Sequence, residues 1–346
     1  MKTHFETEIY AQPDVLRALV ENKAAKVTDI VAQIKAHDPS FVMIAARGTS
    51  DNAATYGKYL FSAFNQTPVA LAAPSLYTLY QQPPNAGKGL VVGISQSGET
   101  PDVMAVLKTA KQQGAPLITI TNIPGSPMDT ICDNTILLDA GVEKSVPASK
   151  TYTAQMAAIA MLSVYWNGDK AMLGELNRLG DLVAEVLEQH ETIKQIAQRF
   201  TETEYMVVVG RGFTHCATYE IALKIKESTY VVAQAFSAAD FRHGPIAILD
   251  PGFPVIAVAP KGKSIGDMRE MVSQIQERDA DLVLISNDDE LCKQVDSVIR
   301  LPAHLPEWLA PIVATVPGQL LALELALAKG IDVDSPRGLH KVTYTL

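Results

Sequence analysis

Short apolar runs recur along the first half of the chain, and longer amphipathic stretches separate them. These runs cover residues 41–46, 90–94, 117–121 and 135–138. They are rich in β-branched residues and do not alternate with polar positions, which is typical of strands buried on both faces of a parallel sheet. Between them, the periodicity predicts helices such as residues 103–113, ended by Gly114. This alternation predicts an α/β fold with a doubly wound parallel sheet.

The second half of the chain repeats this pattern of strands and helices. Its apolar runs cover residues 206–210, 255–259, 282–286 and 298–301. Residues 115–122 resemble residues 280–287 at an offset of 165 positions, and Arg47-Gly48 matches Arg211-Gly212 at an offset of 164. Several segments that share nearly one offset indicate an internal duplication. The sequence therefore predicts two tandem doubly wound parallel-sheet subdomains that are related by this duplication.

The boundary between the two subdomains is expected where a long amphipathic stretch begins. Residues 179–200 carry apolar side chains at helical spacing and predict a linker helix. We therefore expect a first subdomain over residues 1–178, which includes an N-terminal helical segment, and a second over residues 179–346, which includes the tail. The apolar stretch 311–328 contains Pro317, Gly318 and Glu324 in its interior, which predicts a buried core helix and not a membrane span.

Composition narrows the classes of function. The 346 residues carry a formal net charge of -9, so the surface as a whole repels a nucleic-acid backbone. The three cysteines, Cys132, Cys216 and Cys292, are far apart and form neither a metal-ligand pattern nor a disulfide framework. The N-terminus is too charged for a signal peptide. We expect a cytoplasmic protein with no nucleic-acid or membrane partner, no metal and no cofactor.

Two polar turns that follow predicted strands are the candidates for a ligand site. In open α/β sheets, ligands bind beyond the carboxyl ends of the strands. The first turn contains Gly48, Thr49 and Ser50, and the second reads Ser-Gln-Ser-Gly-Glu-Thr at residues 95–100, just before a predicted helix. Hydroxyls and main-chain amides at a helix N-terminus favour an anion. The alternative is an ordinary helix cap, in which the hydroxyls satisfy the amides of the chain itself.

The Ser-Gln-Ser-Gly-Glu-Thr turn resembles the phosphate loop of sugar isomerase (SIS) domains. The likeness extends over nearly the whole chain to the isomerase half of glucosamine-6-phosphate synthase. It includes the segments 146–153, 210–212, 222–227, 241–245 and 334–341. This resemblance implies two parallel-sheet subdomains and a homodimer whose active sites lie at the subunit interface.

The resemblance also implies roles for particular residues. The phosphate ligands of the family fall on Ser50, Ser95, Gln96, Ser97 and Thr100. Further substrate contacts fall on Gly48, Thr49 and Ser149. The carboxylate that moves a proton between the sugar carbons C1 and C2 falls on Glu227, and the lysine one helical turn before it is Lys224. The ring-opening histidine from the neighbouring subunit falls on His243, and the lysine that forms a Schiff base with the keto sugar falls on Lys341.

The chemistry of these side chains is consistent with those roles. Lys224 and Glu227 are spaced i, i+3 and share a helix face, and a carboxylate beside a lysine can take and return a proton. His243 stands beside Gly-Pro, which presents it on a turn, and imidazole titrates near neutral pH. The alternatives are a solvated surface ion pair for the first two residues, a structural role for the histidine, and a solvated tail position for Lys341.

The synthase also has an N-terminal glutaminase domain that supplies ammonia, and the sugar-phosphate segments of this chain begin almost at its first residue. Without an ammonia source, the same chemistry runs toward hydrolysis. We therefore expect deamination of glucosamine 6-phosphate, a hexosamine 6-phosphate, to fructose 6-phosphate and ammonia. Two alternatives stay open. One is an isomerase or deglycase that acts on a related substrate, such as a galactosamine or fructosamine phosphate, and the other is a non-catalytic sugar-phosphate sensor.

Overall fold

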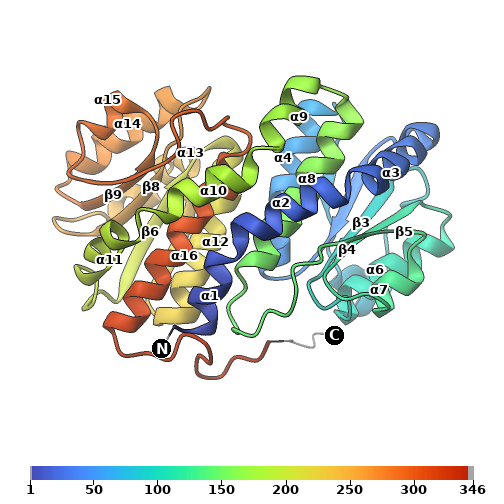
Figure 1. Ribbon diagram of the computed structural model, residues 1–346, viewed down its shortest axis with the longest axis horizontal. Coiled ribbons are helices and arrows are strands. Elements are labelled where there is room, and N and C mark those ends of the chain that lie inside the picture. The colour runs from blue at the N-terminus through green and yellow to red at the C-terminus, as the bar shows by residue number, and fades with distance from the viewer. Residues whose placement is uncertain (1, 342–346) are drawn as a thin grey trace. The chain divides into compact units, whose positions relative to one another are not determined.

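The computed structural model describes residues 2–341, and Figure 1 shows the course of the chain. The chain forms two compact units. Of the described residues, the first unit contains 14–143, 150–178 and 340–341, and the second contains 2–13, 144–149 and 179–339. These units differ from a simple division at residue 178. Residues 2–13 and 144–149 belong to the second unit, and residues 340–341 belong to the first.

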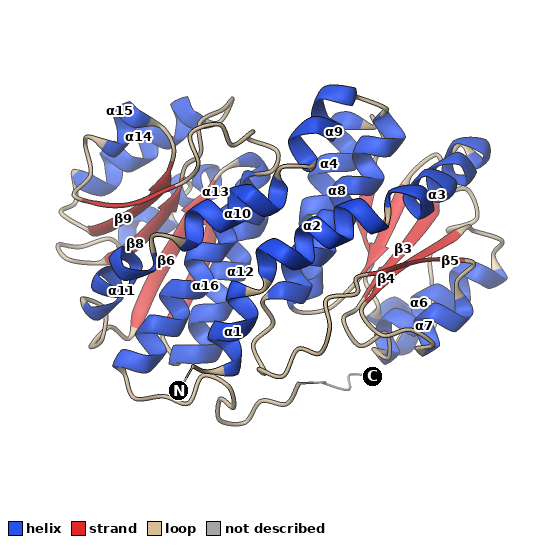
Figure 2. Ribbon diagram, in the orientation of Figure 1, coloured by secondary structure: helices blue, strands red, loops and turns tan. Residues whose placement is uncertain are grey.

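A five-stranded parallel sheet lies at the centre of the first unit. Its strands are β1 (Val42–Ala45), β2 (Val69–Leu71), β3 (Leu90–Ile94), β4 (Leu117–Thr121) and β5 (Asn134–Leu137), in the order β2-β1-β3-β4-β5. Its helices are α3 (Ala24–His37), α4 (Thr49–Phe64), α5 (Ser75–Thr78), α6 (Pro101–Gln112), α7 (Pro127–Ile131), α8 (Lys150–Asn167) and α9 (Lys170–Leu176), and α2 (Gln12–Asn22) leads into them. Figure 2 shows helices on both faces of this sheet, as the continuous apolar strands require.

The second unit is built in the same way. Its strands are β6 (Tyr205–Gly210), β7 (Val232–Ser237), β8 (Pro254–Val258), β9 (Asp281–Ser286) and β10 (Ser297–Arg300), in the order β10-β9-β8-β6-β7. Its helices are α1 (His4–Tyr10), α10 (Leu179–Leu187), α11 (His190–Gln198), η1 (Gly212–Thr214), α12 (His215–Thr229), α13 (Ala238–Arg242), η2 (Pro245–Ile248), α14 (Ile265–Gln276), α15 (Asp289–Cys292) and α16 (Ala310–Ala328). Read from its other end, the strand order matches that of the first sheet, which confirms two tandem doubly wound sheets.

The sequence missed one strand in each sheet. β2 (Val69–Leu71) and β7 (Val232–Ser237) are outer strands, and neither is buried along its whole length. In β7, Val232 is exposed and Gln234 interrupts the apolar run. β2 is apolar but only three residues long, and the polar Gln234 breaks the pattern of β7, so neither strand gives a long continuous apolar run.

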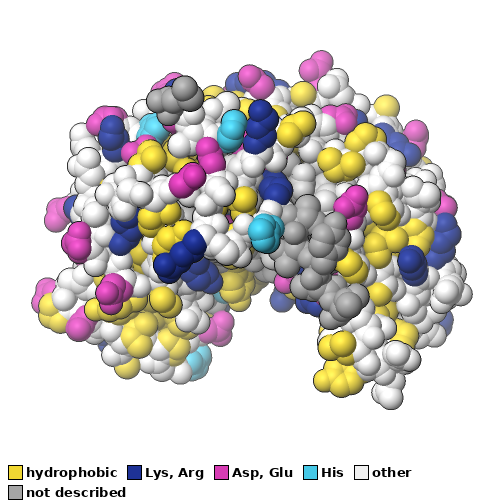
Figure 3. Space-filling model, turned by 90° about the horizontal axis from the view of Figure 1, so that it is seen from below, with side chains coloured by type: hydrophobic (Ala, Val, Ile, Leu, Met, Phe, Trp, Pro, Cys, Tyr) yellow, Lys and Arg dark blue, Asp and Glu magenta, His cyan; other side chains and the backbone are white. Residues whose placement is uncertain are grey.

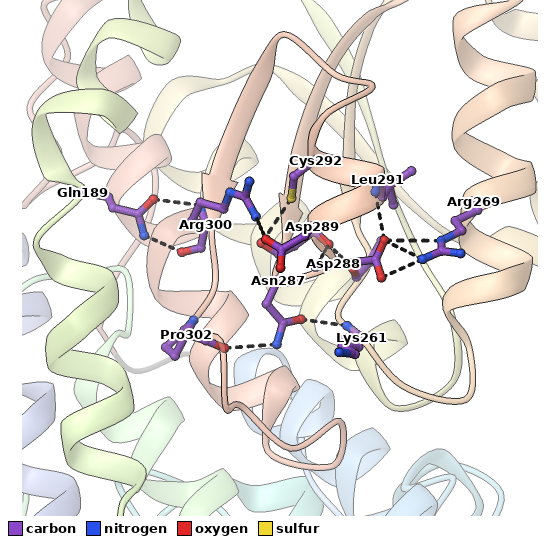
Figure 4. A network of polar contacts seen from close by, with 12 residues as sticks. Gln189, Lys261, Arg269, Asn287, Asp288, Asp289, Leu291, Cys292, Arg300 and Pro302 are labelled. Atoms are coloured by element: carbon purple, nitrogen blue, oxygen red, sulfur yellow. Dashed lines mark hydrogen bonds and ion pairs between the residues drawn. The ribbon is translucent and has the colours of Figure 1, made fainter.

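The predicted linker helix over residues 179–200 is wrong, because two helices take its place. α10 (Leu179–Leu187) and α11 (His190–Gln198) are separated at Gln189, which leaves helical geometry at φ -89° and ψ 11°. The Gln189 side chain binds the main chain of Arg300 in the outer strand β10 (Figure 4). Its Oε1 accepts from the Arg300 N–H at 2.7 Å, and its Nε2 donates to the Arg300 carbonyl. Gln189 thus supplies an edge strand with hydrogen bonds and interrupts the helix.

The C-terminal apolar stretch forms the core helix that the sequence predicts. Within the described part of the chain, α16 (Ala310–Ala328) is long and apolar enough to cross a membrane, but 89% of the qualifying segment is buried inside the protein. Its Gly318 lets the helix approach α12 closely, because a Cβ there would lie 2.3 Å from Cγ1 of Ile221. The two helices therefore pack directly against each other, and α12 contacts β6 and β7 of the second sheet.

Candidate active site

The order of the strands creates a switch point in the first sheet between β1 and β3. These two strands are hydrogen-bonded neighbours, with Ala45 opposite Gly93, and their crossovers leave in opposite directions along the sheet. The segment 47–50 follows β1 and the loop 95–100 follows β3, so the two turns that the sequence selected end at the same edge. This edge is where open α/β sheets bind their ligands.

The loop 95–100 gathers hydroxyl groups and amides before α6. The Ser95 Oγ lies 2.9 Å from the Thr100 Oγ1 and 3.4 Å from the Ser97 Oγ, and it accepts from the Gly98 N–H at 3.2 Å. The Ser97 Oγ accepts from the Glu99 N–H at 3.3 Å. Gly98 has φ +67°, and a Cβ there would come within 2.2 Å of the Ser126 Oγ, so only glycine fits. The loop thus holds several hydroxyl donors in one place at a helix N-terminus.

The other expected phosphate and substrate contacts of the first unit lie around the same edge. Ser50 is buried in the first turn of α4, where Gly48, at φ +55°, and Thr49 begin that helix. The main-chain carbonyl of Gln96 accepts from the Asn122 N–H at 3.1 Å, which ties the loop to the end of β4. The structure therefore brings these predicted residues to one edge of one sheet.

An ion pair that the sequence analysis missed joins the two segments. Arg47, next to Gly48, binds the buried Asp102 in the first turn of α6 through Nε at 2.8 Å and Nη2 at 2.5 Å. Burial raises the pKa of the nearby Asp51 carboxyl, and the positive charge of Arg47 opposes this rise. The internal repeat offers a signal for this ion pair. Arg211 and Asp267 follow Arg47 and Asp102 by 164 and 165 residues, and they also form an ion pair, at 3.2 Å.

In the second unit, α12 places two of the predicted catalytic residues in contact. The Lys224 Nζ lies 2.6 Å from Glu227 Oε2 and 3.4 Å from Glu220 Oε1. The side chains of Lys224 and Glu220 are 1% and 0% exposed, whereas that of Glu227 is 25% exposed. Since a buried charge is costly without partners, the two carboxylates compensate the lysine. The pair is therefore not the solvated surface pair that was the alternative, and Glu220 was not predicted.

His243 and Ser149 occupy very different surroundings in the second unit. His243 ends α13 on an exposed turn, where its N–H donates to the Asp240 carbonyl at 3.1 Å. The neighbouring Arg242 is held by Asp267 at 2.7 Å, which fixes the turn from one side. Ser149, in contrast, is completely buried, and its carbonyl accepts from Gln319 at 3.5 Å.

Lys341, the last described residue, belongs to the first unit. Its Nζ lies 2.7 Å from Oε2 of Glu143, a fully buried carboxylate in the connection before α8. Lys341 is 26% exposed, so it is not the freely solvated tail residue of the alternative interpretation. Glu143 had no place among the sequence candidates, because a single glutamate in a connecting segment carries no pattern.

The remaining candidate chemistry is structural in character. The three cysteines are buried thiols, and burial raises the pKa of Cys132 to about 11. Among residues 2–341, no group of three His, Cys, Asp or Glu side chains is placed to hold a metal ion. On the face drawn in Figure 3, lysine and arginine side chains are dispersed among acidic ones and form no continuous basic field outside the grey atoms.

Beside β9, a polar network stabilises the second unit (Figure 4). Asp288 caps α15 by accepting from the Leu291 N–H at 2.9 Å, and Arg269 binds both of its carboxylate oxygens. Burial alone would raise the pKa of the Asp288 carboxyl, but these hydrogen bonds keep it below its usual value. The network fixes the loops at the carboxyl edge of the second sheet.

Comparison with known proteins agrees with this architecture. The SIS domain family matches residues 37–165 and 199–329. A glutamine–fructose-6-phosphate aminotransferase (isomerizing) from Pyrococcus horikoshii is 34% identical over 339 residues, which are 96% of this chain and 56% of that protein. The chain thus spans little more than half the length of the curated relatives it matches.

Two solved structures extend the comparison. The C-terminal domain of a glucosamine-fructose-6-phosphate aminotransferase from Francisella tularensis is 28% identical, with a TM-score of 0.87 and coverage of 97% of this chain and 99% of that one. A glucosamine-6-phosphate deaminase from Thermotoga maritima shares the fold, at 19% identity, a TM-score of 0.79 and coverage of 99% and 100%. Because the family matches coincide with the two sheets, the chain belongs to the SIS domain family and carries two SIS domains in tandem.

Proposed function

We propose that this phosphosugar isomerase relative is an aminosugar-phosphate deaminase, which converts glucosamine 6-phosphate and water to fructose 6-phosphate and ammonia. The observation that carries the proposal is the ion pair of Lys224 and Glu227 on α12, with its 2.6 Å contact. A buried lysine fixes a carboxylate that stays partly exposed, so the carboxylate is held in place and still accessible to a ligand.

Glu227 suits the proton transfer that this reaction needs. Interconversion of an aldose and a ketose moves a proton between the adjacent carbons C1 and C2, and one base that takes the proton can also return it. The contact with Lys224 limits the positions that the carboxylate adopts, which lowers the entropic cost of reaching a reactive geometry. In this proposal, Glu227 is the catalytic base and Lys224 positions it.

The loop 95–100 suits the phosphate group of the same substrate. The Ser95 hydroxyl lies within 3.4 Å of the hydroxyls of Ser97 and Thr100, and an oxyanion can replace these contacts with its own. The N-terminus of α6 adds a favourable dipole. We therefore assign phosphate binding to this loop together with Ser50 and Gln96.

Two further roles follow the family resemblance. Lys341 is the proposed Schiff-base lysine, and His243, on its exposed turn, is the proposed proton carrier for ring opening. In the proposed homodimer, His243 comes from the neighbouring subunit, which an exposed position permits. Gly48, Thr49 and Ser149 remain proposed substrate contacts, although the burial of Ser149 requires its main chain or a local rearrangement to make the contact.

The direction of the reaction follows from mass action. Amination of fructose 6-phosphate and hydrolysis of glucosamine 6-phosphate are the two directions of one sequence of steps. When free ammonia is scarce, water drives the sequence toward the ketose phosphate. Deamination is therefore the direction that we propose for this chain acting alone.

A panel of sugar phosphates tests the proposal. The protein is incubated with glucosamine, galactosamine and fructosamine 6-phosphates, and ammonia and the ketose product are measured. We expect ammonia and fructose 6-phosphate from glucosamine 6-phosphate. Turnover of another member alone would redirect the proposal to that sugar. If sugar phosphates bind, as measured by calorimetry, but none is converted, the chain is a sensor and the proposal is wrong.

A further inference from the structure

The carboxylate of Glu143 is a buried anion that the proposed chemistry does not yet use. It lies in the connection between β5 and α8, and its side chain is 0% exposed. Oε2 accepts from the Lys341 ammonium at 2.7 Å and from the Thr151 hydroxyl at 2.7 Å, and Oε1 accepts from the Thr151 N–H at 3.1 Å. Both oxygens are therefore engaged within the first unit.

These contacts give Glu143 a fixed position. Thr151 is in the first turn of α8, where main-chain N–H groups lack partners within the helix and the helix dipole favours a negative charge. The neighbouring Lys150 donates to the Val142 carbonyl at 2.9 Å, whereas the ammonium of Lys341 contacts the carboxylate itself. A rigid helix end thus determines where the tail lysine is held.

We propose that Glu143 positions Lys341 and receives its proton when the lysine forms a Schiff base; the proposal rests on the function proposed above. An ammonium is not a nucleophile, so Lys341 must lose one proton before it attacks carbon. Glu143 is the acceptor already in contact with that group. A buried carboxylate is stabilised by a neighbouring positive charge, so the loss of the Lys341 charge favours transient neutralisation of Glu143 by the proton.

The proton balance of the step is complete with the groups at hand. With fructose 6-phosphate, the Lys341 ammonium passes a proton to Glu143, and the neutral amine adds to the C2 carbonyl. The carbinolamine hydroxyl then takes that proton from Glu143 and leaves as water, and the nitrogen lone pair forms the C2–N double bond. Ammonium and carbonyl have become a protonated imine and water, and Glu143 is again a carboxylate beside a cation.

Reductive trapping of the imine tests this assignment independently of overall turnover. The full chain is incubated with fructose 6-phosphate and cyanoborohydride, and peptide mass spectrometry follows the formation of the reduced adduct at Lys341. We expect Glu143→Gln to slow trapping at least tenfold, because the amide keeps hydrogen bonds to Thr151 but accepts no proton. Glu143→Asp keeps the charge but withdraws it by one methylene, so we expect slower trapping from a folded protein.

Two controls separate this role from a structural one. Asp139→Asn removes a different carboxylate, four residues before Glu143, which pairs with Lys23. Reductive trapping in this variant should proceed at the wild-type rate. Thr151→Val removes a structural hydrogen bond to Glu143 but leaves the proton acceptor in place. It should lower the melting temperature and leave the trapping rate close to that of the wild type.

The outcomes are distinguishable. Wild-type trapping rates in both Glu143 variants would overturn the assignment, and if Glu143→Gln does not fold, a wild-type rate in Glu143→Asp alone overturns it. A wild-type chain that is trapped elsewhere than at Lys341 also overturns it. A chain that is trapped at Lys341 but releases no ammonia from any hexosamine 6-phosphate keeps this assignment and overturns only deamination as the function.

Discussion

The two units share a fold but differ in what occupies the equivalent loop after the third strand of each sheet. In the first unit, the Ser95 hydroxyl of the loop 95–100 contacts the hydroxyls of Ser97 and Thr100. In the second unit, the equivalent loop 259–264 is filled from within: the Glu307 carboxylate accepts from the Lys263 N–H at 2.7 Å, the Ser264 N–H at 3.0 Å and the Ser264 hydroxyl at 2.7 Å. One loop thus stays available for an outside anion, while the other is satisfied by its own chain.

The helix after the first strand of each sheet shows the opposite distribution of polar groups. α12 buries Glu220 and Lys224, whereas the equivalent positions in α4, 164 residues earlier, hold the buried Tyr56 and Leu60. The first unit therefore combines an open polar loop with uncharged side chains at these two helix positions. The second combines a closed loop with a charged helix. In the function that we propose, phosphate binding is assigned to the first unit and proton transfer to the second.

What the units keep in common is the framework around these groups. The ion pairs Arg47–Asp102 and Arg211–Asp267 occupy equivalent places. Gly98 and Gly262 are equivalent too, and a Cβ at either would be far too close to its neighbour, at 2.2 Å from the Ser126 Oγ or 2.3 Å from the Glu307 carboxyl carbon. Features shared by both units support the fold, and features found in one unit indicate chemistry.

The largest expected effect is on the charged helix. Glu227→Gln keeps the shape of the side chain but accepts no proton from carbon, so we expect kcat to fall by about 10³-fold or more. Exchange of the C2 hydrogen with deuterated solvent, followed by NMR, should stop as well. Lys226→Met is the matched control on the exposed side of α12 and should keep both activities. C2 exchange at the normal rate in Glu227→Gln would assign the base to another residue.

The proposed dimer sharpens this first prediction. His243→Ala should impair ring opening but not C2 exchange on an open-chain substrate. If His243 acts on the neighbouring subunit, mixing the inactive Glu227→Gln and His243→Ala proteins should restore part of the activity, because one site of each mixed dimer then has both native residues. Mixed dimers that form but stay inactive would place both residues in one subunit.

A smaller effect is expected in the open loop. Ser97→Ala and Thr100→Ala each remove a hydroxyl donor to a dianion, worth about 1.5–3 kcal/mol, so KM should rise by roughly tenfold to a hundredfold with a smaller change in kcat. Ser264→Ala is the control in the closed loop and should leave KM unchanged. Equal KM values in all three variants and the wild type would mean that the hydroxyls of the loop 95–100 serve only as a helix cap.

The smallest effect is expected where the loop is filled from within. Glu307→Ala removes the acceptor of three hydrogen bonds in a partly exposed place, where water replaces some of them, so we expect a loss of about 1–2 kcal/mol in the free energy of unfolding. Urea unfolding measures this loss. KM for the sugar phosphate should not change. A higher KM without loss of stability would contradict the separation of the two loops.

The sequence predicts four strands of each sheet and the duplication well, because continuous apolar runs and a nearly constant offset can be recognised without structural context. It fails at the outer strand β2, which is only three residues long, and at the outer strand β7, where Gln234 interrupts the apolar run. It also fails at Gln189, whose partner is the main chain of a distant strand. It also misses Glu220, although the i, i+4 spacing to Lys224 on α12 is a local signal. Glu143 and Asp102 are missed because their partners lie in distant segments. The resemblance to a family locates Glu227 and the loop 95–100, but only the fold shows that Lys224 is buried.

The position of α16 near the end of the chain has a consequence for the order of folding during synthesis. The second unit needs this helix for its core, and it also takes α1 from the other end: Gln12, just after α1, donates to Gln319 of α16 at 2.8 Å. The first unit is nearly complete at residue 178, so it can form while the ribosome still works. The N-terminal helix α1 is synthesised first but can pack in its native position only after α16 has been synthesised. Proteolysis of chains stopped at residue 309 should therefore leave a protected first unit and a degraded remainder, and protection of the second unit in such chains would contradict this order.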